Sequence, residues 1–85
     1  MNNTACKIAG RLWRIVFDDL DQWGYCDHKT RTITIEKNAS DKMTLDALSH
    51  EVAHASFPFL TEDAIGDFGS DLARLLWKQG WRIKR

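Results

Sequence analysis

The chain of 85 residues lacks the features that mark several large classes of protein. Its two cysteines, Cys6 and Cys26, do not form a C-x-x-C pair, and we expect reduced thiols rather than a disulfide. No apolar stretch is long enough to cross a membrane, and the polar segment 1–10 lacks the hydrophobic run of a signal peptide. These absences predict a cytoplasmic protein without a membrane partner.

The chain also has no net charge, because 12 Lys and Arg residues balance 12 Asp and Glu residues. A nucleic-acid partner is therefore not expected, since phosphate binding relies on an excess of positive charge. The sequence shows no repeat, linker or low-complexity segment, so we expect residues 1–85 to form one small domain. Hydrophobic residues make up 44% of the chain, which allows a small core that a bound metal would stabilise.

Three segments in the first half of the chain are predicted to be strands. Arg11–Phe17 is rich in β-formers, and Tyr25–Asp27 follows Gly24 as a second extended stretch. Arg31–Glu36 alternates polar and apolar residues, which is the period of a strand with one buried face. Residues 28–30 form the expected turn between the last two strands.

Two helices are predicted in the second half. The first runs from about Met43 to Phe57 with Thr44 as its N-cap, and Pro58 ends it. The second begins after the N-cap Thr61 and stops at Gly80. Strands followed by helices predict an α+β fold, with a short antiparallel three-stranded sheet covered by two packed helices.

The most informative segment is the pentapeptide His50-Glu51-Val52-Ala53-His54, which contains two of the three histidines. On a helix, positions i and i+4 share a face, so both imidazoles can bind one Zn²⁺ through ring nitrogens. The carboxylate of Glu51 is displaced around the helix, where it can reach a water on the metal without being a ligand. The pattern predicts a zinc site with Glu51 as general base.

A catalytic zinc usually has three protein ligands, and the second helix offers the acidic candidates Glu62, Asp63, Asp67 and Asp71. At about 100° per residue, the apolar residues of this helix form one stripe that must face the sheet and the motif helix. The stripe consists of Ile65, Phe68, Gly69, Leu72 and Leu76. Glu62 lies at its start, whereas the aspartates lie on the opposite side, so we expect Glu62 to be the third ligand. A displaced helix start would favour Asp63 or Asp67 instead, and Glu62 would then only complement the helix dipole.

These features resemble the zincin metallopeptidases, and more narrowly the small phage and bacterial H-E-x-x-H proteins of the ImmA/IrrE and SprT groups. The resemblance covers residues 24–82 and rests on Arg31–Glu36, Leu45–Ala55 and Asp71–Arg82. It implies that the strand before the motif helix is the sheet edge on which a substrate lies. The chain lacks the G-x-x-H continuation of the metzincins and the N-E-x-x-S-D segment of thermolysin-like enzymes.

The resemblance implies hydrolysis of peptide bonds in a peptide or protein substrate, with His50 and His54 as Zn²⁺ ligands and Glu51 as general base. Glu62 is the candidate third ligand. A donor for the developing oxyanion is usual in such enzymes. Three residues of the second and third predicted strands and their turn are candidates for it: Tyr25, His28 and Arg31.

The alternative to an enzyme is a non-catalytic, zinc-binding regulatory or interaction module of the phage type with the same fold. Such a module would bind a protein partner, and Trp77, Trp81 and the basic tail 82–85 would form its contact surface. The carboxylate of Glu51 discriminates between the two hypotheses, because a purely structural zinc site has no need of it.

Overall fold

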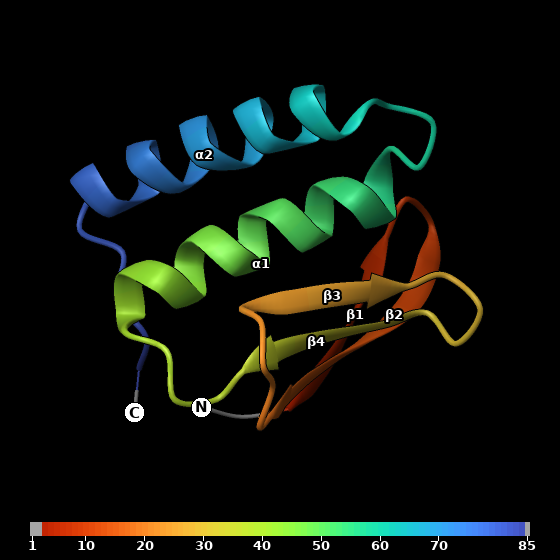
Figure 1. Cartoon of the computed structure of the whole chain (residues 1–85), viewed down its shortest axis with the longest axis horizontal. Coiled ribbons are helices and arrows are strands. Elements are labelled where there is room, and N and C mark those ends of the chain that lie inside the picture. Colours follow the sequence, from red (N-terminus) through yellow and green to blue (C-terminus); the bar gives the residue numbers. More distant parts are fainter. Residues whose placement is uncertain (1–2, 85) are drawn as a thin grey trace.

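The computed structural model describes residues 3–84, which form an α+β arrangement in three layers (Figure 1). The elements in chain order are β1 (Thr4–Ile8), β2 (Arg11–Asp18), β3 (Gly24–Asp27), β4 (Thr32–Glu36), α1 (Asp41–Ser56) and α2 (Glu62–Lys78). The sheet is one layer, α1 packs on one of its faces, and α2 packs on the outer side of α1. In this part of the chain, neither helix is long and apolar enough to span a membrane.

The sheet has the strand order β1-β2-β4-β3 and is mixed. β1 with β2 and β3 with β4 are antiparallel pairs, whereas β2 and β4 are parallel. The predicted sheet of three antiparallel strands is therefore wrong in strand number and in its central pairing, while the α+β class is confirmed. The parallel pair arises because β3 lies outside β4, so the β3–β4 hairpin returns the chain beside β2 in the direction of β2.

β1 is the strand that the sequence pattern does not reveal. Four of its five residues are exposed, so no alternation of buried and exposed positions marks it. The strand is held by a hairpin to β2, with Ile8 opposite Arg11 and only Ala9 and Gly10 between them. Both turn residues have positive φ, 51° and 80°, as in a type I′ turn. Gly10 was the only local signal of this hairpin.

β4 lies inside the sheet, which contradicts the edge position expected for the strand before the motif helix. Ile33 and Ile35 are 0% exposed because they face α1, and Thr34 on the opposite face is only 6% exposed. The free edge beside α1 belongs to β3, which pairs with β4 alone.

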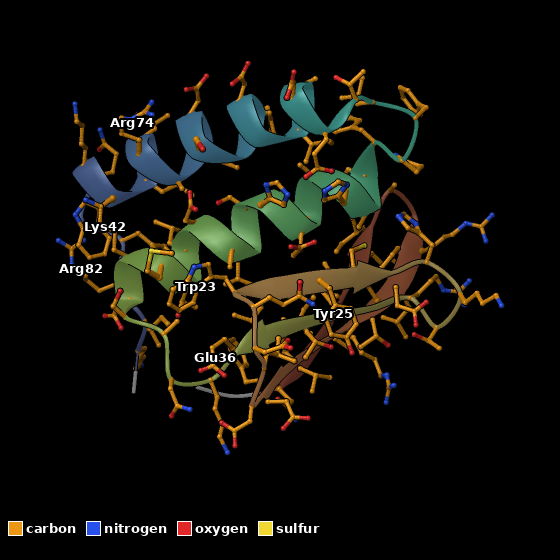
Figure 2. All side chains as sticks on the ribbon, in the orientation of Figure 1. Trp23, Tyr25, Glu36, Lys42, Arg74 and Arg82 are labelled. Atoms are coloured by element: carbon orange, nitrogen blue, oxygen red, sulfur yellow. The ribbon has the colours of Figure 1, made fainter. Side chains whose placement is uncertain are left out.

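The carboxylate of Glu36 anchors the connection that places β3 at this edge (Figure 2). Its Oε1 accepts a hydrogen bond from the backbone N–H of Leu20 at 2.9 Å, and its Oε2 accepts one from Asn38 at 3.0 Å. The backbone N–H of Glu36 also donates to the carbonyl of Trp23 at 2.9 Å. One side chain thus ties the loop before β3 to the loop after β4.

The core lies between the sheet and α1. Its buried members are Ile8, Trp13, Ile15, Ile33, Ile35, Ala47 and Ala55. α1 contributes two alanines to this cluster, so the helix lies close to the large side chains of the sheet. This packing removes the inner face of the sheet from water and supplies most of the hydrophobic stabilisation.

α2 packs on α1 and, within the described residues, makes no contact with the sheet. The prediction that its apolar stripe faces both the sheet and the motif helix is therefore wrong for the sheet. Ile65, Gly69 and Ala73 are buried against α1, whereas Phe68 at the margin of the stripe is 47% exposed. Because α2 packs against α1 alone, it buries a narrower stripe of side chains than a helix that also contacts the sheet would bury.

The helix ends agree with the sequence in three of four cases. The N-cap Thr61 accepts a hydrogen bond from the N–H of Ala64, and Gly80 follows α2 with φ of 94°. α1 ends before Pro58 but begins earlier than predicted, because its N-cap is Ser40 rather than Thr44. Thr44 is 0% exposed inside the helix, and none of the described residues forms a hydrogen bond with its hydroxyl.

These two residues give a test of where α1 begins. Ser40→Ala removes the side-chain oxygen that accepts from the N–H of Met43, and we expect it to lower the free energy of unfolding by about 1 kcal/mol. Thr44→Val replaces an unpaired buried hydroxyl by a methyl group of the same shape, and we expect no loss of stability. Urea denaturation measures both. A larger loss in Thr44→Val than in Ser40→Ala would place the cap at Thr44.

Candidate metal centre

His50 and His54 lie one turn apart on α1, on the side of the helix between α2 and the edge strand β3. Their rings are 4.8 Å apart between centroids, and the two Nε2 atoms are 3.1 Å apart. The side chains are 31% and 27% exposed, respectively. Both imidazoles therefore direct the same ring nitrogen toward one point at the protein surface.

Glu62 is the first residue of α2, and its carboxylate reaches the same point. Its Oε1 is 3.1 Å from Nε2 of His50, and its Oε2 is 3.2 Å from Nε2 of His54. The link 57–61 is short enough to bring the start of α2 back over the end of α1. The tight hairpin expected from the sequence thus places Glu62 beside both histidines.

The distances within this group suit a bound metal ion. Two ligand atoms at about 2.0–2.1 Å from a tetrahedral zinc lie about 3.3 Å from each other. The separations observed among the three residues are 3.1–3.4 Å. Two imidazoles and one carboxylate are also a donor set typical of catalytic zinc. The Glu62 side chain is 72% exposed, which leaves one side of the group open to water.

The rival acidic residues of α2 are not part of this group. In residues 3–84, His50, His54 and Glu62 are the one set of His, Cys, Asp or Glu side chains close enough to share an ion. Asp63 and Asp67 are exposed and lie around the helix from Glu62. Asp71 forms an exposed ion pair with Arg74 at 3.0 Å instead.

Glu51 is 7% exposed and points from α1 toward β3 rather than toward α2. Burial raises the pKa of its carboxyl; the adjacent His50 and His54 lower it in part, and Glu62 raises it further. The structure gives it no hydrogen bond within the described residues, yet its oxygens are not sealed from solvent. The carboxylate is therefore available to a water molecule between the histidines and the sheet edge.

Gly24 makes room for this carboxylate, and sequence reasoning assigned it no role. A Cβ at this position would lie 3.0 Å from the carbonyl oxygen of Thr34 and 3.4 Å from Cγ of Glu51. Any side chain there would push β3 from β4 or displace Glu51. A glycine at the start of an extended segment is the only sequence signal of this contact.

The predicted oxyanion donors are not brought to the group. Tyr25 lies between Gly24 and Cys26, which face α1, so its own side chain is on the opposite face of the sheet. His28 sits in the β3–β4 turn, edge-on to Trp13. Arg31 also lies in that turn, where its Nε donates to the carbonyl of Leu12 at 3.2 Å. These residues serve the hairpin.

The chain was compared with protein families, curated proteins and solved structures. No family model matches the chain, and neither the curated proteins nor the solved structures searched gave a match. The function is therefore inferred from the residues of the site itself.

Two glycines of α2 test whether helix packing sets the ligand geometry. A Cβ on Gly69 would lie 3.0 Å from Cα and 3.1 Å from N of His50, so Gly69→Ala forces the helices apart. We expect it to cost about 1–3 kcal/mol of stability and to weaken zinc binding, because Glu62 moves away from the histidines. Thermal unfolding and zinc titration measure the two effects.

Gly66→Ala is the matched control, since a Cβ on Gly66 would meet nothing within 4 Å. We expect this variant to gain about 0.5–1 kcal/mol from helix propensity and to bind zinc as the wild type does. Equal zinc affinity in both variants would show that the helix contact does not set the position of Glu62.

The two cysteines are predicted to differ in reactivity. Burial, the charge of Glu51 and the charge of Asp27 raise the pKa of Cys26 to about 11, so about 0.1% of its thiol is ionised at pH 8. Cys6 is exposed on β1. We expect iodoacetamide to alkylate Cys6 first at pH 8, and Cys26 to become reactive only as the pH approaches its pKa. Peptide mass spectrometry gives both rates, and faster labelling of Cys26 would contradict the expected environment of its thiol.

Proposed function

We propose that the protein is a zinc-dependent peptidase in which His50, His54 and Glu62 hold the metal and Glu51 is the general base. The proposal is supported by the way α1 separates its polar side chains. His50 and His54 direct their imidazoles toward Glu62, whereas the carboxylate of Glu51 lies outside this ligand group. A structural metal site has no use for this extra carboxylate.

When bound, zinc would supply Lewis acidity, which makes a water more acidic and polarises a carbonyl group. The residues of the chain perform the remaining tasks. Glu51 accepts the proton of the attacking water at its carboxylate, and it then donates this proton to the leaving amine. The raised pKa of Glu51 favours the first step, because a more basic carboxylate accepts the proton of the water more readily.

The free edge of β3 is the surface on which a substrate would lie. β3 pairs with β4 on one side only, and it contacts α1 beside Glu51. An extended peptide can add to such an edge by backbone hydrogen bonds, without regard to its sequence. A peptide in this position would have one of its peptide bonds near Glu51 and the histidine pair. The edge expected from the resemblance thus has its counterpart in β3, not in β4.

Two substitutions separate metal binding from catalysis. We expect Glu51→Gln to retain one zinc per chain and to lose hydrolysis of a casein or peptide-library substrate by a factor of at least about 100. We expect Glu62→Ala to lose zinc, because two histidines alone do not complete the site. Metal analysis after dialysis and product detection by mass spectrometry measure the two properties.

Asp63→Ala is the matched control, since Asp63 shares the first turn of α2 with Glu62 but lies outside the ligand group. It should keep zinc and hydrolysis. Full zinc occupancy in Glu62→Ala would remove Glu62 from the ligand set. Hydrolysis at the wild-type rate in Glu51→Gln would exclude the mechanism.

The second candidate is a zinc-binding interaction module without catalysis. It is favoured by the exposed aromatic side chains at the α1–α2 hairpin, where Phe59 is 79% exposed and Phe57 contacts Phe68. The contact surface predicted around Trp77 and Trp81 is a different one, and Arg85 of its basic tail lies outside the described residues. Zinc binding without hydrolysis in the wild type would favour this candidate.

A further inference from the structure

A cavity of about 420 Å³ lies between the start of α1 and the end of α2, away from the histidines. Both helices contribute to it, and Trp77 forms part of its wall. The lining residues are Lys42, Met43, Asp46, Ser70, Ala73, Arg74, Trp77 and Lys78. The hydrolysis proposed above assigns no role to this cavity.

Positive charge gathers around the cavity. The guanidinium of Arg82 stacks on the Trp77 ring, with Cζ 3.4 Å from the ring centroid, and Nζ of Lys42 is 6.0 Å from that centroid. Figure 2 shows Lys42, Arg74 and Arg82 together at the end of the molecule where α1 begins. Among the described residues, Arg74 has an ion-pair partner, whereas Lys42, Lys78 and Arg82 have none.

Arg82 is fixed in this position by its own chain. Its Nη1 donates to the backbone carbonyls of Trp77 at 3.3 Å and Trp81 at 2.6 Å. A stacked guanidinium with a restrained orientation loses little conformational freedom when a carboxylate binds to it. The apolar ring and the cations together suit a ligand that carries both a carboxylate and an aliphatic stem.

The cavity and the metal centre lie on the same side of the helix pair. On α1, Met43, Asp46 and His50 follow one another at helical spacing, and on α2 the same holds for Glu62, Gly66 and Ser70. Met43 precedes His50 by seven residues, which is about 10 Å along the helix axis. An extended peptide covers this distance with about three residues.

We propose that the Trp77 cavity binds a carboxylate of the peptide whose scissile bond lies at the metal centre, about three residues away. This inference rests on the proposed peptidase function for the position of the peptide. A Glu or Asp side chain or a terminal carboxylate supplies the same chemistry. A nucleic acid fits less well, because Asp46 in the cavity wall would repel a continuous chain of phosphates and the protein has no net positive charge.

The test measures binding and does not need hydrolysis. Zinc-loaded Glu51→Gln protein is titrated with capped short peptides that differ only by one Glu or Gln, moved position by position along an Ala-Ser chain. A Gln peptide with a free terminal carboxylate separates that group from a side chain. The Trp indole N–H signals in NMR report occupancy of the cavity. We expect about three- to tenfold tighter binding of the Glu peptide at one position, reduced by salt.

Substitutions in the cavity test whether its lysines cause the preference for a carboxylate. We expect the pair Lys42→Gln and Lys78→Gln to abolish the preference for carboxylate, whereas Lys29→Gln in the β3–β4 turn should leave it unchanged. Equal affinity for the Glu and Gln peptides, or a preference that survives the paired substitution, would overturn the proposal. Tighter binding of a single-stranded oligonucleotide than of the Glu peptide would also overturn it.

The result for carboxylate binding can be distinguished from the result for peptide hydrolysis. A carboxylate preference in a protein that hydrolyses nothing would leave the cavity as a binding site and refute the peptidase. Hydrolysis by the wild type without any carboxylate preference would refute the cavity proposal alone.

Discussion

Gly69 of α2 packs directly against the backbone of His50, and this contact determines how close the two helices approach. The missing Cβ lets α2 lie on α1 at the level of the first histidine. Because the link 57–61 is short, the start of α2 lies near the end of α1, and Glu62 is held beside both imidazoles. The candidate metal centre is thus a product of helix packing, with the ligands supplied by the two faces that the packing brings together.

The same helix serves the sheet on its other side. Glu51 faces the free edge of β3, where Gly24 leaves the space that its side chain occupies. The carboxylate is buried enough to raise its pKa, yet no hydrogen bond from another described residue holds it away from water. A base kept apart from the metal ligands, between them and a strand edge, is an arrangement suited to chemistry on an extended peptide.

Sequence patterns predicted correctly those features that depend only on residues close together in the chain. The stop at Pro58 and the cap Thr61 follow from capping rules and are confirmed. Helix periodicity also favoured Glu62 over the aspartates, and Glu62 does lie beside both histidines, while its role as a ligand stays a prediction. Thr44 was a wrong choice of cap because Ser40 offers the same chemistry one turn earlier. The hydrophobic pattern of the sequence does not predict β1, because an exposed edge strand needs no alternation of apolar and polar residues.

The helical spacing of His50, Glu51 and His54 and the position of Glu62 at a helix start can be predicted from the chain alone, because they depend on neighbours within a few residues. Which strand borders the site depends on the tertiary structure. The place of β3 outside β4 depends on pairing between distant segments and on loop contacts such as those of Glu36. Such pairings leave no period in the sequence, since hydrogen bonds between backbones are nearly independent of side-chain type.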